Sequence, residues 1–136
     1  MHLDAKAAIA VLNDRPHSVR ARFEEARDKG AALAMSIVVY HELMYGAAAS
    51  ERRLQNEEKI ALFIGSGRVE LLPFEEEDAR EAADIRAHLK RSGTPIGPYD
   101  VFIAAQARRR GATLITANGR EFARVPGLMV MMDWAA

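Results

Sequence analysis

Apolar residues follow two patterns along this chain: short continuous runs, and longer stretches in which they recur at helical spacing. Continuous runs of this length are typical of strands that are buried on both faces. They predict strands at residues 1–4, 32–36, 68–74, 112–116 and 128–134. Spacings of three and four residues, as between Val19, Phe23 and Ala26, predict helices between the strands. We expect the helices at residues 5–13, from Pro16 to about 29, 37–50, 51–67, 75–93 and from Asp100 onward, with a short helical turn at 118–125.

The alternation of strands and helices indicates an α/β fold, because parallel strands need a crossover connection that is usually a helix. Strands that are apolar throughout also indicate that helices cover both faces of the sheet. We therefore predict a three-layer α/β/α sandwich with a mainly parallel sheet, formed by a single domain over residues 1–136. In such sheets ligands bind beyond the carboxyl ends of the strands, so polar residues at those ends are candidates for function.

The composition excludes several classes of site. The chain has no cysteine, so it contains no disulfide and no thiolate zinc site. Its formal net charge is zero, which argues against a general nucleic-acid-binding surface but allows a local basic patch. No segment has the pattern of a signal peptide or the roughly 18 apolar residues of a membrane span. We therefore expect a cytoplasmic protein that does not enter a membrane.

Polar residues gather where the predicted strands end. Asp4 ends the first strand, Thr116 ends the fourth, and Asn118 follows two residues later. Asp100 heads the helix that leads into the fourth strand, and Glu42 lies on an otherwise apolar row of the helix after the second. A carboxylate on an apolar row is costly unless it is paired, protonated or bound to a metal. Because oxygen ligands suit Mg²⁺ or Mn²⁺, the three acids are candidate metal ligands beside Asn118 and Thr116.

Each of these residues also has a purely structural explanation. Asp4 and Asp100 stand at predicted helix starts, where aspartate is an ordinary N-cap. Asn118 precedes a glycine, as turn residues often do, and Glu42 can extend from its helix into solvent. Only the combination, at one edge of a parallel sheet, favours a functional site.

Two other motifs are less informative. The segment HELMY has Tyr45 where a zinc-binding motif needs its second histidine, so a metalloprotease site is excluded. Arg108, Arg109 and Arg110 are explained either as a solvated helix end, favourable to the helix dipole, or as contacts to a phosphate backbone. We favour the solvated helix end for at least two of the three.

The chain resembles the PIN-domain ribonucleases, and in particular the VapC toxins of bacterial toxin–antitoxin pairs. The resemblance covers essentially the whole chain and includes LD near the start, ELMYG, GTPIGPYD, NGREFARVPGL and the closing DW. It implies Mg²⁺- or Mn²⁺-dependent hydrolysis of an RNA phosphodiester. It assigns metal binding to Asp4, Glu42 and Asp100, and further catalytic positions to Asn118 and Thr116.

The same resemblance implies binding partners. It suggests a homodimer that is inhibited by a cognate antitoxin and that contacts operator DNA only through this antitoxin. The segment GTPIGPYD is similar to that of toxins that cut initiator tRNA, so tRNA is the expected substrate.

One motif departs from the family. Members with this ending usually begin LDTN, whereas this chain reads LDAK. Ala5 lacks the hydroxyl that would cap the first helix, and Lys6 brings an ammonium close to Asp4. We expect Lys6 to weaken metal binding without unfolding the protein. Two hypotheses follow. The first is an active metal-dependent endoribonuclease toxin, with activity retained but reduced by Lys6. The second is a catalytically weakened PIN module that acts mainly in an antitoxin-bound, DNA-binding autorepressor complex.

Overall fold

The computed structural model describes residues 1–15 and 17–131. Strands and helices follow one another in the order predicted from the sequence. They are β1 (His2–Leu3), α1 (Ala5–Asn13), α2 (His17–Asp28), β2 (Ala34–Ser36), α3 (Ile37–Ala48), α4 (Arg53–Gly65), β3 (Glu70–Leu72), α5 (Glu76–Arg91), α6 (Pro98–Arg109), β4 (Thr113–Ile115), α7 (Gly119–Phe122) and β5 (Met129–Met131).

The five strands form one parallel sheet in the order β3-β2-β1-β4-β5. In the central strand β1, Leu3 lies between Met35 of β2 and Ile115 of β4. The chain leaves β1 towards β2 and later returns to β4 on the opposite side, so the direction of winding reverses between β1 and β4. A reversal of this kind opens a crevice beyond the carboxyl ends of the two strands. The residues that follow β1 and β4 therefore face each other.

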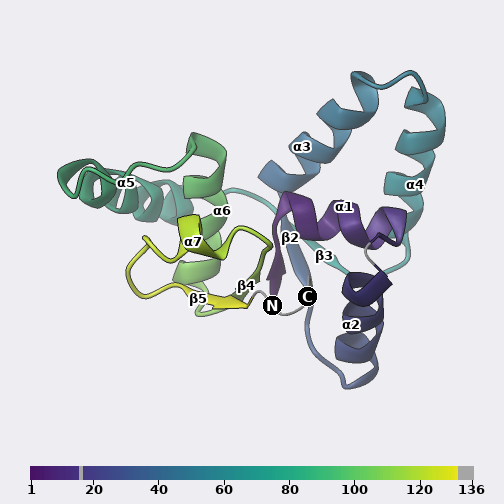
Figure 1. Cartoon of the computed structure of the whole chain (residues 1–136), viewed down its shortest axis with the longest axis horizontal. Helices are drawn as coiled ribbons and strands as arrows, with labels where there is room; N and C mark the ends of the chain where they lie inside the picture. The colour runs from purple at the N-terminus through teal and green to yellow at the C-terminus, as the bar shows by residue number, and fades with distance from the viewer. Residues whose placement is uncertain (16, 132–136) are drawn as a thin grey trace.

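Helices cover both faces of the sheet (Figure 1). Helices α1 to α4 lie on one side, and α5 and α6 lie on the other. The strands contribute fully buried apolar side chains to the core between these layers, among them Leu3, Met35 and Leu114. The predicted three-layer α/β/α sandwich is confirmed. Across residues 1–15 and 17–131, no helix is both long enough and apolar enough to cross a membrane.

Some predicted boundaries are wrong. Helix α6 begins at Pro98 with Gly97 as its N-cap, because proline suits the first position of a helix. Asp100 is therefore the third residue of the helix and not its cap. Several other elements are shorter than predicted, as is common at frayed ends. The predicted start of the second helix at Pro16 and the end of the last strand at 132–134 lie outside the described residues.

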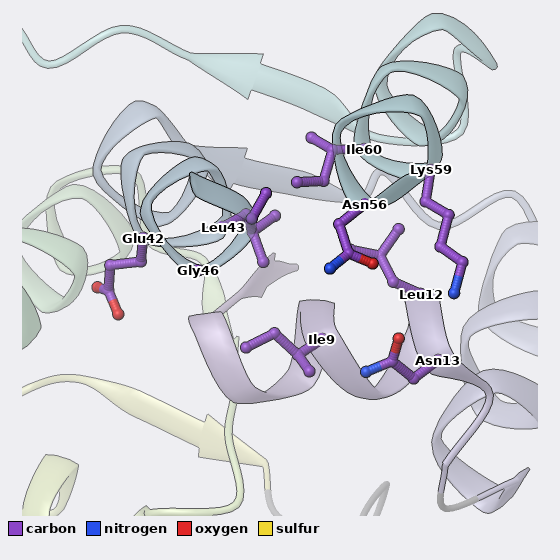
Figure 2. A pocket seen from close by; sticks show the side chains of 10 residues that line it. Ile9, Leu12, Asn13, Glu42, Leu43, Gly46, Asn56, Lys59 and Ile60 are labelled. Carbon is purple, nitrogen blue, oxygen red and sulfur yellow. The ribbon is translucent and has the colours of Figure 1, made fainter. Parts of the chain in front are cut away.

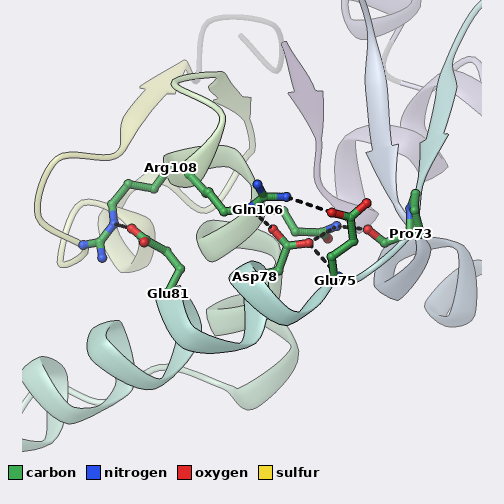
Figure 3. Close-up of polar contacts among 7 residues, drawn as sticks. Pro73, Glu75, Asp78, Glu81, Gln106 and Arg108 are labelled. Carbon is green, nitrogen blue, oxygen red and sulfur yellow. Dashed lines mark hydrogen bonds and ion pairs between the residues drawn. The ribbon is translucent and has the colours of Figure 1, made fainter.

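The arginines at the end of α6 are mostly paired with acids of α5 (Figure 3). The Arg109 Nε donates to the buried carboxylate of Asp78 at 2.6 Å, and the Arg108 Nε donates to Glu81. These pairs join α5 to α6. The prediction that at least two of the arginines are solvated is wrong, because only Arg110 is exposed.

Candidate active site

Asp4 combines a capping role with a buried charge. Its Oδ1 accepts a hydrogen bond from the backbone N–H of Ala7 at 2.8 Å, so Asp4 is the N-cap of α1. The residue is 4 % exposed, and burial raises the pKa of its carboxyl. A hydrogen bond with the Thr116 hydroxyl, the Ala7 N–H and the charge of Lys6 offset only part of this rise. Ala5 is the first residue of the helix, so the expectation that a hydroxyl at this position would cap α1 is wrong.

Thr116 and Asn118 lie opposite Asp4, just after β4. The backbone N–H of Asn118 donates to the Thr116 Oγ1 at 2.8 Å, which closes a tight turn. Thr116 is buried, and its hydroxyl is also hydrogen-bonded to Asp4. Thr116 thus connects the end of β4 to the residue after β1. Both residues occupy the edge of the sheet at which they were predicted.

Glu42 reaches the same region from α3. This helix is capped by Ser36, whose Oγ accepts the Val38 N–H at 2.9 Å. Burial raises the pKa of the Glu42 carboxyl, the negative charge of Asp4 raises it further, and His41 lowers it. The Oε1 of Glu42 is buried and has no hydrogen-bond partner. A buried oxygen without a protein partner is rare and is normally satisfied by a water molecule or an ion.

Asp100 has the most perturbed carboxyl of the group. Burial raises its pKa from 3.8 to about 6, together with the negative charges of Glu121, Glu42 and Asp4 and a hydrogen bond with Glu121. Each of these acids therefore lies close enough to Asp100 for its charge to act there. The four carboxyls, which come from three helices and the end of β1, form one cluster that we call the acidic cluster: Asp4, Glu42, Asp100 and Glu121.

The sequence analysis missed Glu121. It lies on α7, three residues after Asn118, and this spacing places both side chains on one face of the helical turn. Its carboxylate accepts hydrogen bonds from the side-chain amide of Asn118 and, at 3.3 Å, from the backbone N–H of Gly97. Glu121 thus ties α7 to the start of α6. The sequence did contain a signal for Glu121. It is an acid in the first helical turn after β4, and this strand is already followed by the candidates Thr116 and Asn118.

The cluster is not a closed metal-binding site. Within residues 1–15 and 17–131, no three acidic or histidine side chains stand close enough together to hold a metal ion without moving. The donor chemistry nevertheless fits a hard divalent cation, because all the donors are oxygens and one of them lacks any partner. A cation would also relieve the mutual repulsion that raises the pKa values of the acids.

Lys6 lies on the rim of the cluster. Its side chain is exposed on α1, and it forms no ion pair with Asp4 in the described part of the chain. Its charge lowers the pKa of Asp4, as the smallest of the contributions named above. An exposed ammonium of this kind is well screened by water.

Comparison with known proteins identifies the family. The model of the PIN domain matches residues 1–128. The chain belongs to the PIN-domain family. This PIN domain is 37% identical over 133 residues to a tRNA(fMet)-specific endonuclease VapC of Salmonella typhimurium, and the match covers 97% of the chain and 96% of the relative. The predicted resemblance to PIN-domain proteins of the VapC type is confirmed.

Solved structures agree with this assignment. VapBC2 from Rickettsia felis, bound to a DNA fragment from its promoter, matches with a TM-score of 0.87 and 31% identity, over 96% of each chain. DNA-bound VapBC from Salmonella typhimurium matches with a TM-score of 0.86 and 35% identity, over 96% of this chain and 95% of that one. The PIN domain described here therefore has the same architecture as toxins that have been crystallised with their antitoxins.

Proposed function

We propose that this PIN domain is a metal-dependent endoribonuclease toxin that cleaves tRNA, with initiator tRNA as its target, and that a cognate antitoxin inhibits it. The observation that carries the proposal is the acidic cluster, in which residues from distant parts of the chain come together beyond the carboxyl ends of β1 and β4. The similarity to a tRNA(fMet)-specific endonuclease supports the choice of substrate.

Asp4, Glu42 and Asp100 would hold Mg²⁺ or Mn²⁺. When bound, the ion would lower the pKa of a water molecule and neutralise charge on the scissile phosphate. The unpartnered Oε1 of Glu42 and the raised pKa of Asp100 support this role, because His41 offsets only part of the rise at Glu42 and the charges described above as acting on Asp100 are all negative. No arginine or lysine is paired with any of these three acids in the described residues.

The remaining polar residues would hold the acids in place. Thr116 is hydrogen-bonded to Asp4, and Asn118 donates to Glu121. Glu121 in turn lies close enough to Asp100 for its charge to raise the pKa of that carboxyl. Rotation of Asp4 and Glu121 is thereby restricted, and orienting groups of this kind contribute strongly to metal affinity.

A groove beside the cluster supports the proposal of an antitoxin (Figure 2). It has a volume of about 230 Å³ and lies between α1, α3 and α4. Its apolar walls include Ile9, Leu43 and Ile60, Lys59 lies at one end, and Glu42 lies at the other with its carboxylate turned outward. An apolar antitoxin segment would fill this groove, and a basic residue of the antitoxin would reach the acids.

Exposed apolar side chains on the same hairpin of helices support a homodimer as well. Tyr45, Leu54 and Leu62 are exposed on α3 and α4, where a second protein surface would cover them. The net charge of zero agrees with operator contact through the antitoxin alone.

The alternative of a catalytically weakened module depends on Lys6. Its exposed position and weak effect on Asp4 favour the active enzyme. The decisive experiment is incubation of the purified protein with initiator and elongator methionine tRNAs, with Mg²⁺ or with EDTA, followed by mapping of the new ends. We expect metal-dependent cleavage of the initiator tRNA, and its loss in Asp100→Asn but not in Asp84→Asn, which changes an exposed acid of α5. Absence of metal-dependent cleavage of any tRNA would favour the weakened module.

A further inference from the structure

An exposed pair of rings lies beside the acidic cluster. Tyr99 and His41 contact each other edge to face, with ring centroids 5.5 Å apart and ring planes at 62°. Tyr99 directly precedes Asp100 on α6, and His41 directly precedes Glu42 on α3. The two helices that contribute these acids therefore also contribute the pair, and the rings lie next to the site.

The pair is not explained by the packing of the core. Tyr99 is 48% exposed, His41 is exposed as well, and the fully buried phenylalanines lie elsewhere. An edge-to-face contact covers at most one face of either ring. Because Tyr99 is 48% exposed, part of its side chain is accessible to solvent beside the cluster. Pro98, at the first position of α6, fixes the backbone just before Tyr99, so the ring is held on a rigid support.

We propose that Tyr99, oriented by His41, is the platform on which a nucleobase adjacent to the scissile phosphate stacks. The proposal rests on the proposed function and adds a substrate-binding residue to it. Stacking suits this site, because every base has a π face and the interaction needs no charge.

Charge alone gives RNA little affinity at this site. The chain has no net charge, the cluster itself repels phosphate, and two of the three arginines of α6 are engaged by acids of α5. Stacking of a base on Tyr99 would compensate for this weak electrostatic attraction, because the contact is uncharged. Loss of one stacked base corresponds to about a five- to a hundredfold loss of affinity.

The test compares Tyr99→Phe, which keeps the ring, with Tyr99→Leu, which keeps an apolar side chain of similar size without it. The substrate is a fluorescein-labelled RNA with the sequence of the initiator tRNA anticodon stem-loop. We expect Tyr99→Leu to raise KM by about tenfold or more with little change in kcat, because stacking contributes equally to ground state and transition state. Tyr99→Phe should resemble the wild type, and His41→Ala should show a smaller rise in KM.

Abasic nucleotides at each position around the cut identify the stacked base. Removal of the base at one position should weaken RNA binding by the wild type as much as Tyr99→Leu does. The same abasic RNA should bind Tyr99→Leu no more weakly than the intact RNA does. Anisotropy of the same RNA without metal gives a readout that does not need cleavage. Equal KM values and equal binding for Tyr99→Leu and the wild type would overturn the proposal. A different outcome separates the two proposals. If the wild type cleaves no RNA but still binds it, and Tyr99→Leu loses this binding, the proposed function is refuted and the stacking platform is retained.

Discussion

Asp100→Asn is expected to stabilise the metal-free protein even though it removes a proposed metal ligand. The folded-state pKa of Asp100, about 6, lies above the ordinary value of 3.8. The native state therefore binds this proton more tightly than the unfolded chain does, and stability is lost as the pH rises from about 4 through 6. At neutral pH the folded protein carries an ionised carboxylate that its surroundings disfavour, and the amide of asparagine would not be ionised.

The magnitude follows from the pKa. A rise from 3.8 to about 6 corresponds to at most about 3 kcal/mol, at 1.36 kcal/mol per pKa unit. Asp100 is only half-buried, so solvent screening reduces this figure. Asp100 also lies in the first turn of α6, where loss of the negative charge forfeits about 0.3–1 kcal/mol of helix-dipole stabilisation. We expect a net gain of about 1 kcal/mol, or roughly 4 °C in Tm for a domain of this size.

The assay is thermal unfolding in EDTA at pH 8 and pH 4, with Asp84→Asn as the control for the same chemical change at an exposed position of α5. Asp100→Asn should melt higher than the wild type at pH 8, and the difference should nearly vanish at pH 4. Addition of Mg²⁺ at pH 8 should raise the Tm of the wild type more than that of the variant. A variant that melts lower than the wild type at pH 8, or that shows the same gain at both pH values, would refute the electrostatic reasoning.

Two further predictions concern charges at other positions. Arg109→Met should lower the free energy of unfolding by about 2–4 kcal/mol in urea titrations, because it leaves the buried Asp78 without its charged partner. The control Arg80→Met breaks an exposed pair with Glu76 and should lower the free energy of unfolding by under about 1 kcal/mol. Similar losses in both variants would show that the buried pair has no special role. The double change of Ala5→Thr and Lys6→Asn should leave the Tm within a few degrees of the wild type. It should tighten Mg²⁺ binding by no more than about fivefold in calorimetry, because the interaction of an exposed lysine with the acids is worth about 1 kcal/mol or less. A much larger gain would mean that Lys6 turns towards the acids.

The sequence predicted the fold and most of the acidic cluster for the same reason. Continuous apolar runs identify strands that are buried on both faces, and the polar residues after them must then lie at one edge of a parallel sheet. Asp4, Thr116 and Asn118 follow directly from this rule, since they come immediately after β1 and β4. The strand order itself, which places β1 beside β4, has no local signal in the sequence.

The errors arose where tertiary contacts decide. Arg108 and Arg109 look solvated because lysines and arginines at a helix end usually are, but the packing of α5 against α6 brings Glu81 and Asp78 to them. Glu121 looks like an ordinary acid at the start of a helical turn. Its role depends on Gly97 and Asp100, which lie more than twenty residues away along the chain. Contacts of this range do not leave a pattern in a single sequence.

The hydrogen bonds around the acidic cluster suggest that a metal cation and a basic side chain of an antitoxin would compete for the carboxylate of Glu42. Asp4 is held by the Ala7 N–H and the Thr116 hydroxyl, and Glu121 is held by Asn118 and Gly97. Among the four acids of the cluster, Glu42 is the one whose buried oxygen has no partner in the described part of the chain, and a polar atom in that state costs about 1–3 kcal/mol. A cation and a basic side chain of an antitoxin would each supply what this oxygen lacks, and Glu42 stands at the end of the groove proposed for the antitoxin. Because both would satisfy the same atom, occupation by one would disfavour the other. Inhibition would then need no distortion of the fold, only a positive charge delivered along the groove.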